Sequence, residues 1–349
     1  MKKITKLFLV IISAASLNVS AFAGDLNVTG SVKSTVTQGD GTGLYSKGLG
    51  ISNELAFNAN GEVTSGYTWK WQMELDGAST GNDDTRLELT TPTMGTVAMY
   101  ISEGDLSSKL GYGIGAVGVG SDYANTYSTA TGNNIWGKNI SAYNNLQYHT
   151  PADLLPYDIS VKFGFSPNLS NSQGSSGKAK GSAETRAEGD DVMQTKITAS
   201  PIDGLSVGGD YMSYDGSSSA VYEKSSGGLF AKYTVGAFTL GAAGTRHETL
   251  KTSAQTTGGV NYESEMYGVQ FAVNDALSLS VSRENFDQIT SRILEGFENT
   301  TVQMQSDHVQ AAYVIGGATL GIAMVETTDV DFVKSKDAKM TTFSVALAF

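Results

Sequence analysis

The sequence predicts an all-β protein, a transmembrane antiparallel β-barrel of about sixteen strands. Three observations predict this fold. Apolar and polar residues alternate with a period of two along many segments of the chain. Short turns rich in Gly, Asn, Asp and Pro alternate with long polar connections. The segment 341–349 is strand-like, with one apolar face and one small or polar face, and it ends at Phe349.

The first element is a secretory signal peptide over residues 1–23. Three lysines and a short apolar run precede the small-residue site that ends at Ala23, which is the usual order of such a peptide. The alternative is a membrane anchor, but the apolar run is too short to span a bilayer. We expect cleavage after Ala23, which leaves residues 24–349. Because the removed segment carries three basic residues, the mature chain keeps 20 basic and 35 acidic residues and a net charge of −15.

Strand-like alternation follows, from end to end of the mature chain. It is clearest over 67–75, where aromatic and aliphatic residues alternate with Thr68, Lys70, Gln72 and Glu74. Similar patterns cover 26–33, 51–57, 86–90 and 157–165. One apolar face and one polar face over such lengths are typical of membrane-spanning strands. A soluble β-sandwich is the alternative, but its strands average about 5–6 residues, and these are longer.

The connections predict the strand number. Short turns are expected at 58–61, 91–95, 151–156, 200–204, 235–237, 273–276 and 315–317. Long loops are expected at 34–48, 76–84, 102–140, 166–190, 215–226, 247–261, 286–302 and 327–338. Seven turns and eight loops join sixteen strands, with both termini on the short-turn side. Barrels of about 16–18 strands are wide enough to hold water.

Composition argues against several classes of chemistry. The chain has no cysteine, 41 glycines, 5 prolines and 40% hydrophobic residues, which suits many strands around a polar interior. Its three histidines lie in different predicted hairpins, without metal-ligand spacing. The paired acids at 83–84 and 329–331 could meet a divalent cation, but nothing there resembles a calcium loop, so they are interpreted as solvated loop residues. We therefore expect no metal, no cofactor, no nucleic-acid partner and no enzymatic activity.

Three stretches resemble the general porins of Gram-negative bacteria. They are 50–75, the pair 84–89 and 94–97, and the run Asn144-Asn145-Leu146-Gln147-Tyr148-His149-Thr150-Pro151. The resemblance implies an outer-membrane homotrimer that contacts lipid and lipopolysaccharide. It also implies that Phe349 is the signal recognised by the barrel-assembly machinery.

The resemblance further implies that the loop over about 102–139 folds into the lumen as a constriction. The Gly-rich run 111–120 is too apolar for a solvated loop, although a surface loop or an extra hairpin remains the alternative. Charges at a narrow point set ion selectivity. The candidate constriction residues are the loop acids Glu103, Asp105 and Asp122 and the inward-facing bases Lys33, Lys70, Arg86, Lys162 and Lys196. Arg86 matches the family's basic position best, but the family's further base after Gly95-Thr96-Val97 is missing.

These features predict a water-filled channel for passive diffusion of ions and small hydrophilic solutes, with a weak preference for cations. A substrate-specific channel of the same fold is the first rival hypothesis. A row of aromatic residues along the lumen would favour it, but few tyrosines, among them Tyr100 and Tyr143, fall on the polar face. Two further hypotheses come from different classes: a barrel that acts as an enzyme or adhesin, and a soluble secreted β-protein.

Overall fold

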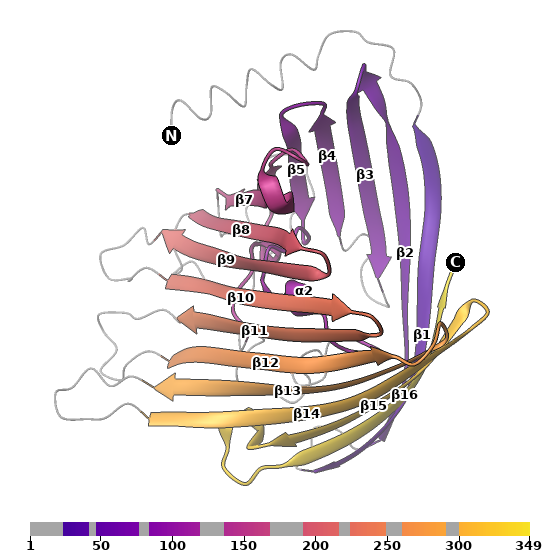
Figure 1. Ribbon diagram of the computed structural model, residues 1–349, viewed down its shortest axis with the longest axis vertical. Helices are drawn as coiled ribbons and strands as arrows, with labels where there is room; N and C mark the ends of the chain where they lie inside the picture. Colours follow the sequence, from indigo (N-terminus) through magenta and orange to yellow (C-terminus); the bar gives the residue numbers. More distant parts are fainter. Residues whose placement is uncertain are drawn as a thin grey trace, which may run out of the picture.

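The computed structural model describes residues 24–41, 47–76, 84–118, 136–167, 191–215, 224–248, 260–290 and 300–349. It is a closed barrel of sixteen antiparallel strands (Figure 1). Each strand pairs with the next along the chain, and β1 closes the barrel by pairing with β16. The predicted fold class and strand number are confirmed. The predicted signal peptide lies outside the described residues.

The strands are β1 Asp25–Gly41, β2 Lys47–Thr64, β3 Tyr67–Asp76, β4 Thr85–Thr91, β5 Gly95–Ile101, β6 Asn145–His149, β7 Ser160–Ser166, β8 Asp191–Ile202, β9 Leu205–Asp215, β10 Lys224–Val235, β11 Phe238–Glu248, β12 Val260–Ala272, β13 Leu277–Thr290, β14 Thr300–Ile315, β15 Ala318–Thr328 and β16 Ala338–Ala348. Short helical turns are α2 Lys109–Tyr112, η1 Ile140–Ala142, η2 Pro156–Asp158 and η4 Val330–Phe332. No helix in the described part of the chain is long and apolar enough to cross a membrane.

One predicted turn is wrong. The segment 58–61 was expected to end a strand because it is rich in Asn and Gly. Instead β2 continues through it to Thr64, and Asn58 donates a side-chain hydrogen bond to Thr29 Oγ1 on the neighbouring strand, at 3.2 Å. The chain turns at 65–66, where Gly66 has a φ of 77°, a left-handed conformation that favours glycine.

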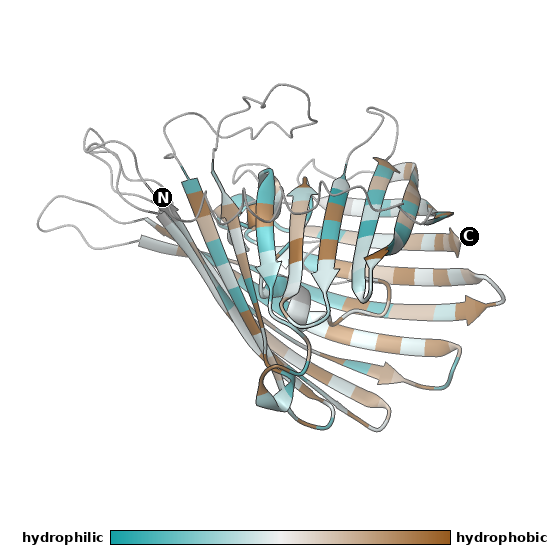
Figure 2. Cartoon of the chain, turned by 90° about the horizontal axis from the view of Figure 1, so that it is seen from above, coloured by the Kyte–Doolittle hydropathy of each residue, from teal (hydrophilic) through white to brown (hydrophobic). Residues whose placement is uncertain are grey.

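The two faces of the barrel differ as the alternation predicts. Large apolar side chains point outward and are exposed, such as Leu49 (85%) and Leu229 (71%). Polar or small residues alternate with them and point inward, which gives the strands their banded colouring in Figure 2. An apolar exterior is stable only against lipid or another apolar surface, so the fold fits a membrane-spanning barrel.

The inner face divides into two sectors. On β8–β14 many inward side chains are buried and few are exposed, whereas on β1–β4 many of them are exposed. Phe230, Met266, Phe286 and Met304 of the first sector form an apolar cluster with residues from the segment after β5. We call the inner face of β8–β14 the covered sector and that of β1–β4 the accessible sector.

Candidate functional site

The segment between β5 and β6 lies against the covered sector. Its described parts, 102–118 and 136–144, place backbone N–H groups next to polar side chains of the inner wall. These hydrogen bonds run from Ser108 N to Asp210 Oδ1 (2.6 Å), Ala116 N to Ser280 Oγ (2.8 Å), Val117 N to Gln310 Oε1 (3.0 Å), Lys138 N to Ser226 Oγ (2.9 Å) and Ile140 N to Gln194 Oε1 (2.8 Å). Buried peptide N–H groups need acceptors, and the wall provides them.

Apolar packing holds the same segment in place. Tyr112 and Ile114 are completely buried, and the Trp136 ring meets Phe286 edge to face, with ring centroids 5.2 Å apart. Glycine in the wall permits this close approach, because a Cβ added at Gly241 would overlap the Ile114 side chain. That the segment narrows a water-filled path stays a prediction. Asp122, one of its predicted acids, lies outside the described residues.

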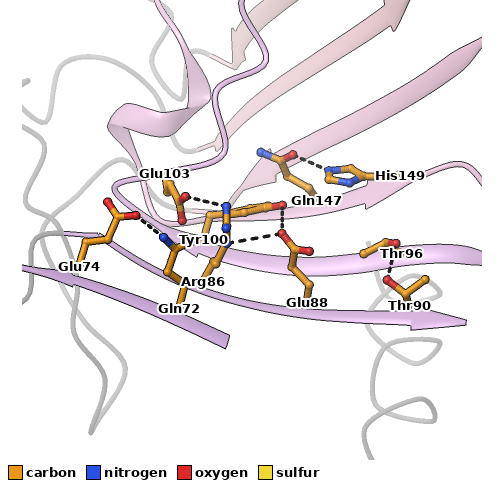
Figure 3. Close-up of polar contacts among 10 residues, drawn as sticks. All are labelled: Gln72, Glu74, Arg86, Glu88, Thr90, Thr96, Tyr100, Glu103, Gln147 and His149. Atoms are coloured by element: carbon orange, nitrogen blue, oxygen red, sulfur yellow. Dashed lines mark hydrogen bonds and ion pairs between the residues drawn. The ribbon is translucent and has the colours of Figure 1, made fainter. Parts of the chain in front are cut away.

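The accessible sector carries a group of interacting charges (Figure 3). Arg86 Nη1 lies 3.0 Å from Glu103 Oε1, and Arg86 Nε lies 3.9 Å from Glu88 Oε1. Tyr100 Oη donates to Glu88 Oε1 at 2.9 Å, and the Gln72 amide donates to Glu74.

Strand register explains why these residues meet. Gln72, Arg86 and Tyr100 are direct cross-strand neighbours on β3, β4 and β5, and all three point inward. Glu88 lies two residues along β4 from Arg86 and opposite Lys70 of β3. Glu103 reaches the same place from the connection that follows β5. Neighbouring inward positions of β3, β4 and β5, together with one loop residue, therefore build the group.

Burial dominates the ionisation of Glu103. Loss of solvation raises its pKa above the usual range of a glutamate, and the negative charges of Asp84 and Glu88 raise it further. The Arg86 guanidinium acts in the opposite direction but does not cancel the effect of burial. Glu103 therefore takes up a proton at a higher pH than an ordinary surface glutamate.

A second set of bases lies on another part of the wall. Lys162 of β7 and Lys196 of β8 are direct cross-strand neighbours, and Lys196 Nζ donates to the Ser107 carbonyl at 2.9 Å. Asp105 accepts a hydrogen bond from Ser107 N at 2.5 Å. Lys196 thus contacts the segment between β5 and β6 near its beginning, at Ser107, shortly after Glu103.

The structure brings together only some of the predicted constriction residues. Glu103 and Arg86 form an ion pair, Lys70 lies opposite Glu88, and Lys162 lies beside Lys196. Lys33 stands apart on β1, opposite Ser52 of β2 and Ala346 of β16.

Sequence reasoning missed the acids of the wall itself, Glu54, Glu74 and Glu88. The signal is present in the sequence, since the alternation that places Lys70 and Arg86 on the inner face places these three there as well. The family resemblance assigns the acids to the loop, so only bases were expected on the wall.

The last residue completes the barrel. Phe349 N donates to the Gly30 carbonyl at 2.9 Å, and Gly30 N donates to the Phe349 carbonyl at 2.7 Å. A Cβ added at Gly30 would lie 2.7 Å from the Phe349 ring, so glycine makes room for that ring on β1. The terminal aromatic therefore sits at the seam where β16 meets β1.

Solved structures of outer-membrane proteins share this barrel. An anion-selective porin from Comamonas acidovorans matches with a TM-score of 0.67 and 12% identity, over 93% of this chain and 100% of that one. OmpT of Vibrio cholerae in a trimer form matches with a TM-score of 0.62 and 13% identity, over 94% of this chain and 100% of that one. OmpF of Salmonella typhi in complex with daunomycin matches with a TM-score of 0.60 and 12% identity, over 94% of this chain and 98% of that one. No protein-family model and no curated protein matches the chain. At these identities the likeness shows the fold.

Among the residues that the structure describes, no group of three or more His, Asp or Glu side chains is arranged to hold a metal ion.

Proposed function

We propose that the chain is an outer-membrane porin, a water-filled channel through which ions and small hydrophilic solutes diffuse passively without a catalytic step. The observation that carries this proposal is the closed barrel with an apolar exterior and a charged, solvent-exposed sector inside. A closed barrel leaves no backbone hydrogen-bonding group unpaired at an edge, as a lipid environment requires. Barrels of about this strand number leave room for water between their walls.

We propose further that the channel weakly prefers cations. Glu74, Glu88 and Glu103 lie around Arg86, and Glu54 is the next inward acid along β2, so the acids there outnumber the bases. Field lines concentrate in a narrow water path with low-dielectric walls, and a small local excess of charge is then felt by every passing ion. The same fold serves an anion-selective porin from Comamonas acidovorans, so the local charges rather than the fold decide the sign.

Location and assembly belong to the same proposal. The chain would be exported with its signal peptide removed after Ala23 and would insert as a homotrimer in the outer membrane of a Gram-negative bacterium, among lipid and lipopolysaccharide. The trimer form of the similar Vibrio cholerae OmpT supports this assembly. Phe349 would be read by the barrel-assembly machinery. Its deletion is then expected to reduce the barrel in the outer membrane more than synthesis or export, and normal barrel levels would contradict that role.

Planar-bilayer recording of the purified protein tests the channel. Stepwise conductance is expected, with a reversal potential in a KCl gradient whose sign shows that potassium permeates better than chloride. A protein that inserts as a folded barrel but never conducts would refute the channel. Conducting steps with chloride preference would refute only the cation preference.

A further inference from the structure

Carboxylates crowd around one guanidinium in the accessible sector. We call Glu54, Glu74, Glu88 and Glu103 the acidic cluster. Glu74 pairs across the strands with Ala56, and Glu54 is the next inward residue along β2. Glu74 accepts a hydrogen bond from the Gln72 amide, and Gln72 is the cross-strand neighbour of Arg86. Arg86 bridges Glu88 and Glu103 at 3.9 and 3.0 Å. Negative charge and hydrogen-bond acceptors are therefore in excess at this place.

Two acceptor atoms within the group have no hydrogen-bond donor among the described residues. They are Gln72 Oε1 and Glu103 Oε2, and both atoms are buried. Gln72 is only 9% exposed, and its NH2 group is engaged by Glu74, which fixes how its amide lies. Buried acceptors normally have partners, so N–H donors brought to this place by a solute would complete its hydrogen bonding.

Arg86 shows which kind of donor fits. A guanidinium presents several N–H groups in a planar fork that suits carboxylates. The Arg86 side chain is 35% exposed, so it forms the solvent-facing part of the group and can be replaced from the lumen. A solute with similar N–H donors would meet the same carboxylates.

We propose that the acidic cluster, with the Gln72 amide oxygen, is a binding subsite for organic cations that carry guanidinium or ammonium N–H donors. This inference rests on the proposed function, because the solute reaches the cluster through the lumen. The solute competes with Arg86 for Glu103 and Glu88, and its remaining donors are available to Glu74 and Gln72. Binding is brief, since the same charges must release the solute for it to pass.

Single-channel recording of the full mature protein tests the subsite with two probes. One is agmatine, a linear dication with guanidinium and ammonium donors. The other is a bis-quaternary ammonium dication of similar length, which has the same charge and no N–H donor. Agmatine is expected to interrupt the current with a residence time at least about tenfold longer than the quaternary probe. Equal residence times would show attraction by charge alone and would overturn the proposal.

Three variants locate the effect. Glu74→Gln combined with Glu103→Gln should shorten agmatine blocks severalfold, whereas Glu326→Gln, the same change on the outer face, should leave them unchanged. Arg86→Ala should lengthen the blocks, because it removes the resident competitor, and a misfolded protein could not produce that gain. Unchanged blocks in the double variant, or shorter blocks in Arg86→Ala, would overturn the subsite. A wild-type channel that conducts without agmatine block would also overturn it and would leave the proposed function intact.

Discussion

The covered and accessible sectors of the inner wall obey the same period-two rule and use it differently. In the covered sector the inward positions are mainly apolar or uncharged, as at Met212, Phe286 and Gln310, and a segment of the chain is bound to them. In the accessible sector more of them are charged, as at Lys70 and Arg86, and no described segment covers most of them. One strand pattern thus supports a packed core on one side of the barrel and a solvated surface on the other.

The difference shows what holds the segment after β5. Its peptide N–H groups are matched by Asp210, Ser280 and Gln310, and its apolar side chains are matched by an apolar cluster. The inward positions of the accessible sector also carry acceptors, such as Glu54 and Glu74, but none of the described apolar clusters includes a residue of β1–β4. The composition of the inward positions therefore decides on which side of the barrel the segment lies.

The most damaging change should be the loss of an aromatic anchor in the covered sector. Phe286→Ala removes a ring that is 1% exposed and packs against Trp136. Removal of a buried phenylalanine costs about 3–5 kcal/mol, so the free energy of unfolding should fall and the segment should loosen. Urea unfolding and single-channel noise measure the two effects. Phe343→Ala, on the outer face, is the control, and an equal loss there would show that Phe286 has no special role.

A smaller effect is expected from the polar anchor of the same segment. Asp210 accepts hydrogen bonds from Ser108 N at 2.6 Å and from the Gln194 amide at 2.9 Å. Asp210→Ala leaves a buried N–H without its partner, which costs about 1–3 kcal/mol. Hydrogen exchange at Ser108 should accelerate. Asp287→Ala is the matched control, since Asp287 accepts only from Gln303 on the outer face in the described contacts, at 3.0 Å. Unchanged exchange at Ser108 would contradict the anchoring role.

The sequence predicted the barrel well because the barrel depends on local pattern. Alternation over 67–75 identified a strand with its two faces, and Gly or Pro at 91–95 and 315–317 marked real turns. The segment 58–61 misled because its Asn and Gly residues look like a turn, although cross-strand pairing continues through them to Thr64. Strand pairing is a contact between segments, and a local pattern does not contain it.

The site was less predictable for the same reason. Alternation placed Arg86 inward, but it could not show that Glu103 comes back from the loop to meet it. Alternation also could not show that Lys162 and Lys196 lie on a different part of the wall from Arg86. The position of a strand around the barrel depends on how the whole barrel closes. The Glu74 and Glu88 carboxylates were visible in the pattern and were overlooked.

The accessible sector should respond through ion selectivity more than through stability. Glu103→Gln combined with Asp105→Asn removes two negative charges near Arg86 and Lys196. A unit charge about 4 Å away contributes roughly 4 kcal/mol at an effective dielectric constant of 20, and mobile ions reduce this. We expect the potassium-to-chloride permeability ratio to fall by a factor of about two to five. Salt-gradient reversal potentials measure it, with Glu326→Gln as a control. A shift toward potassium would contradict the hypothesis that Glu103 and Asp105 favour cations.

The smallest expected effect is the pH dependence of that selectivity. Burial raises the pKa of Glu103, so its negative charge is lost, as the pH falls, before that of an ordinary glutamate with a pKa of about 4.3. Potassium preference should therefore decline on acidification, beginning above that value. Arg86 keeps its charge throughout, so the net charge at this place moves in the positive direction as the proton binds. Reversal potentials measured over a pH series should show this decline in the wild type. Glu103→Gln should show a lower preference at neutral pH and a flatter profile, whereas identical profiles in both proteins would assign the titration to another group.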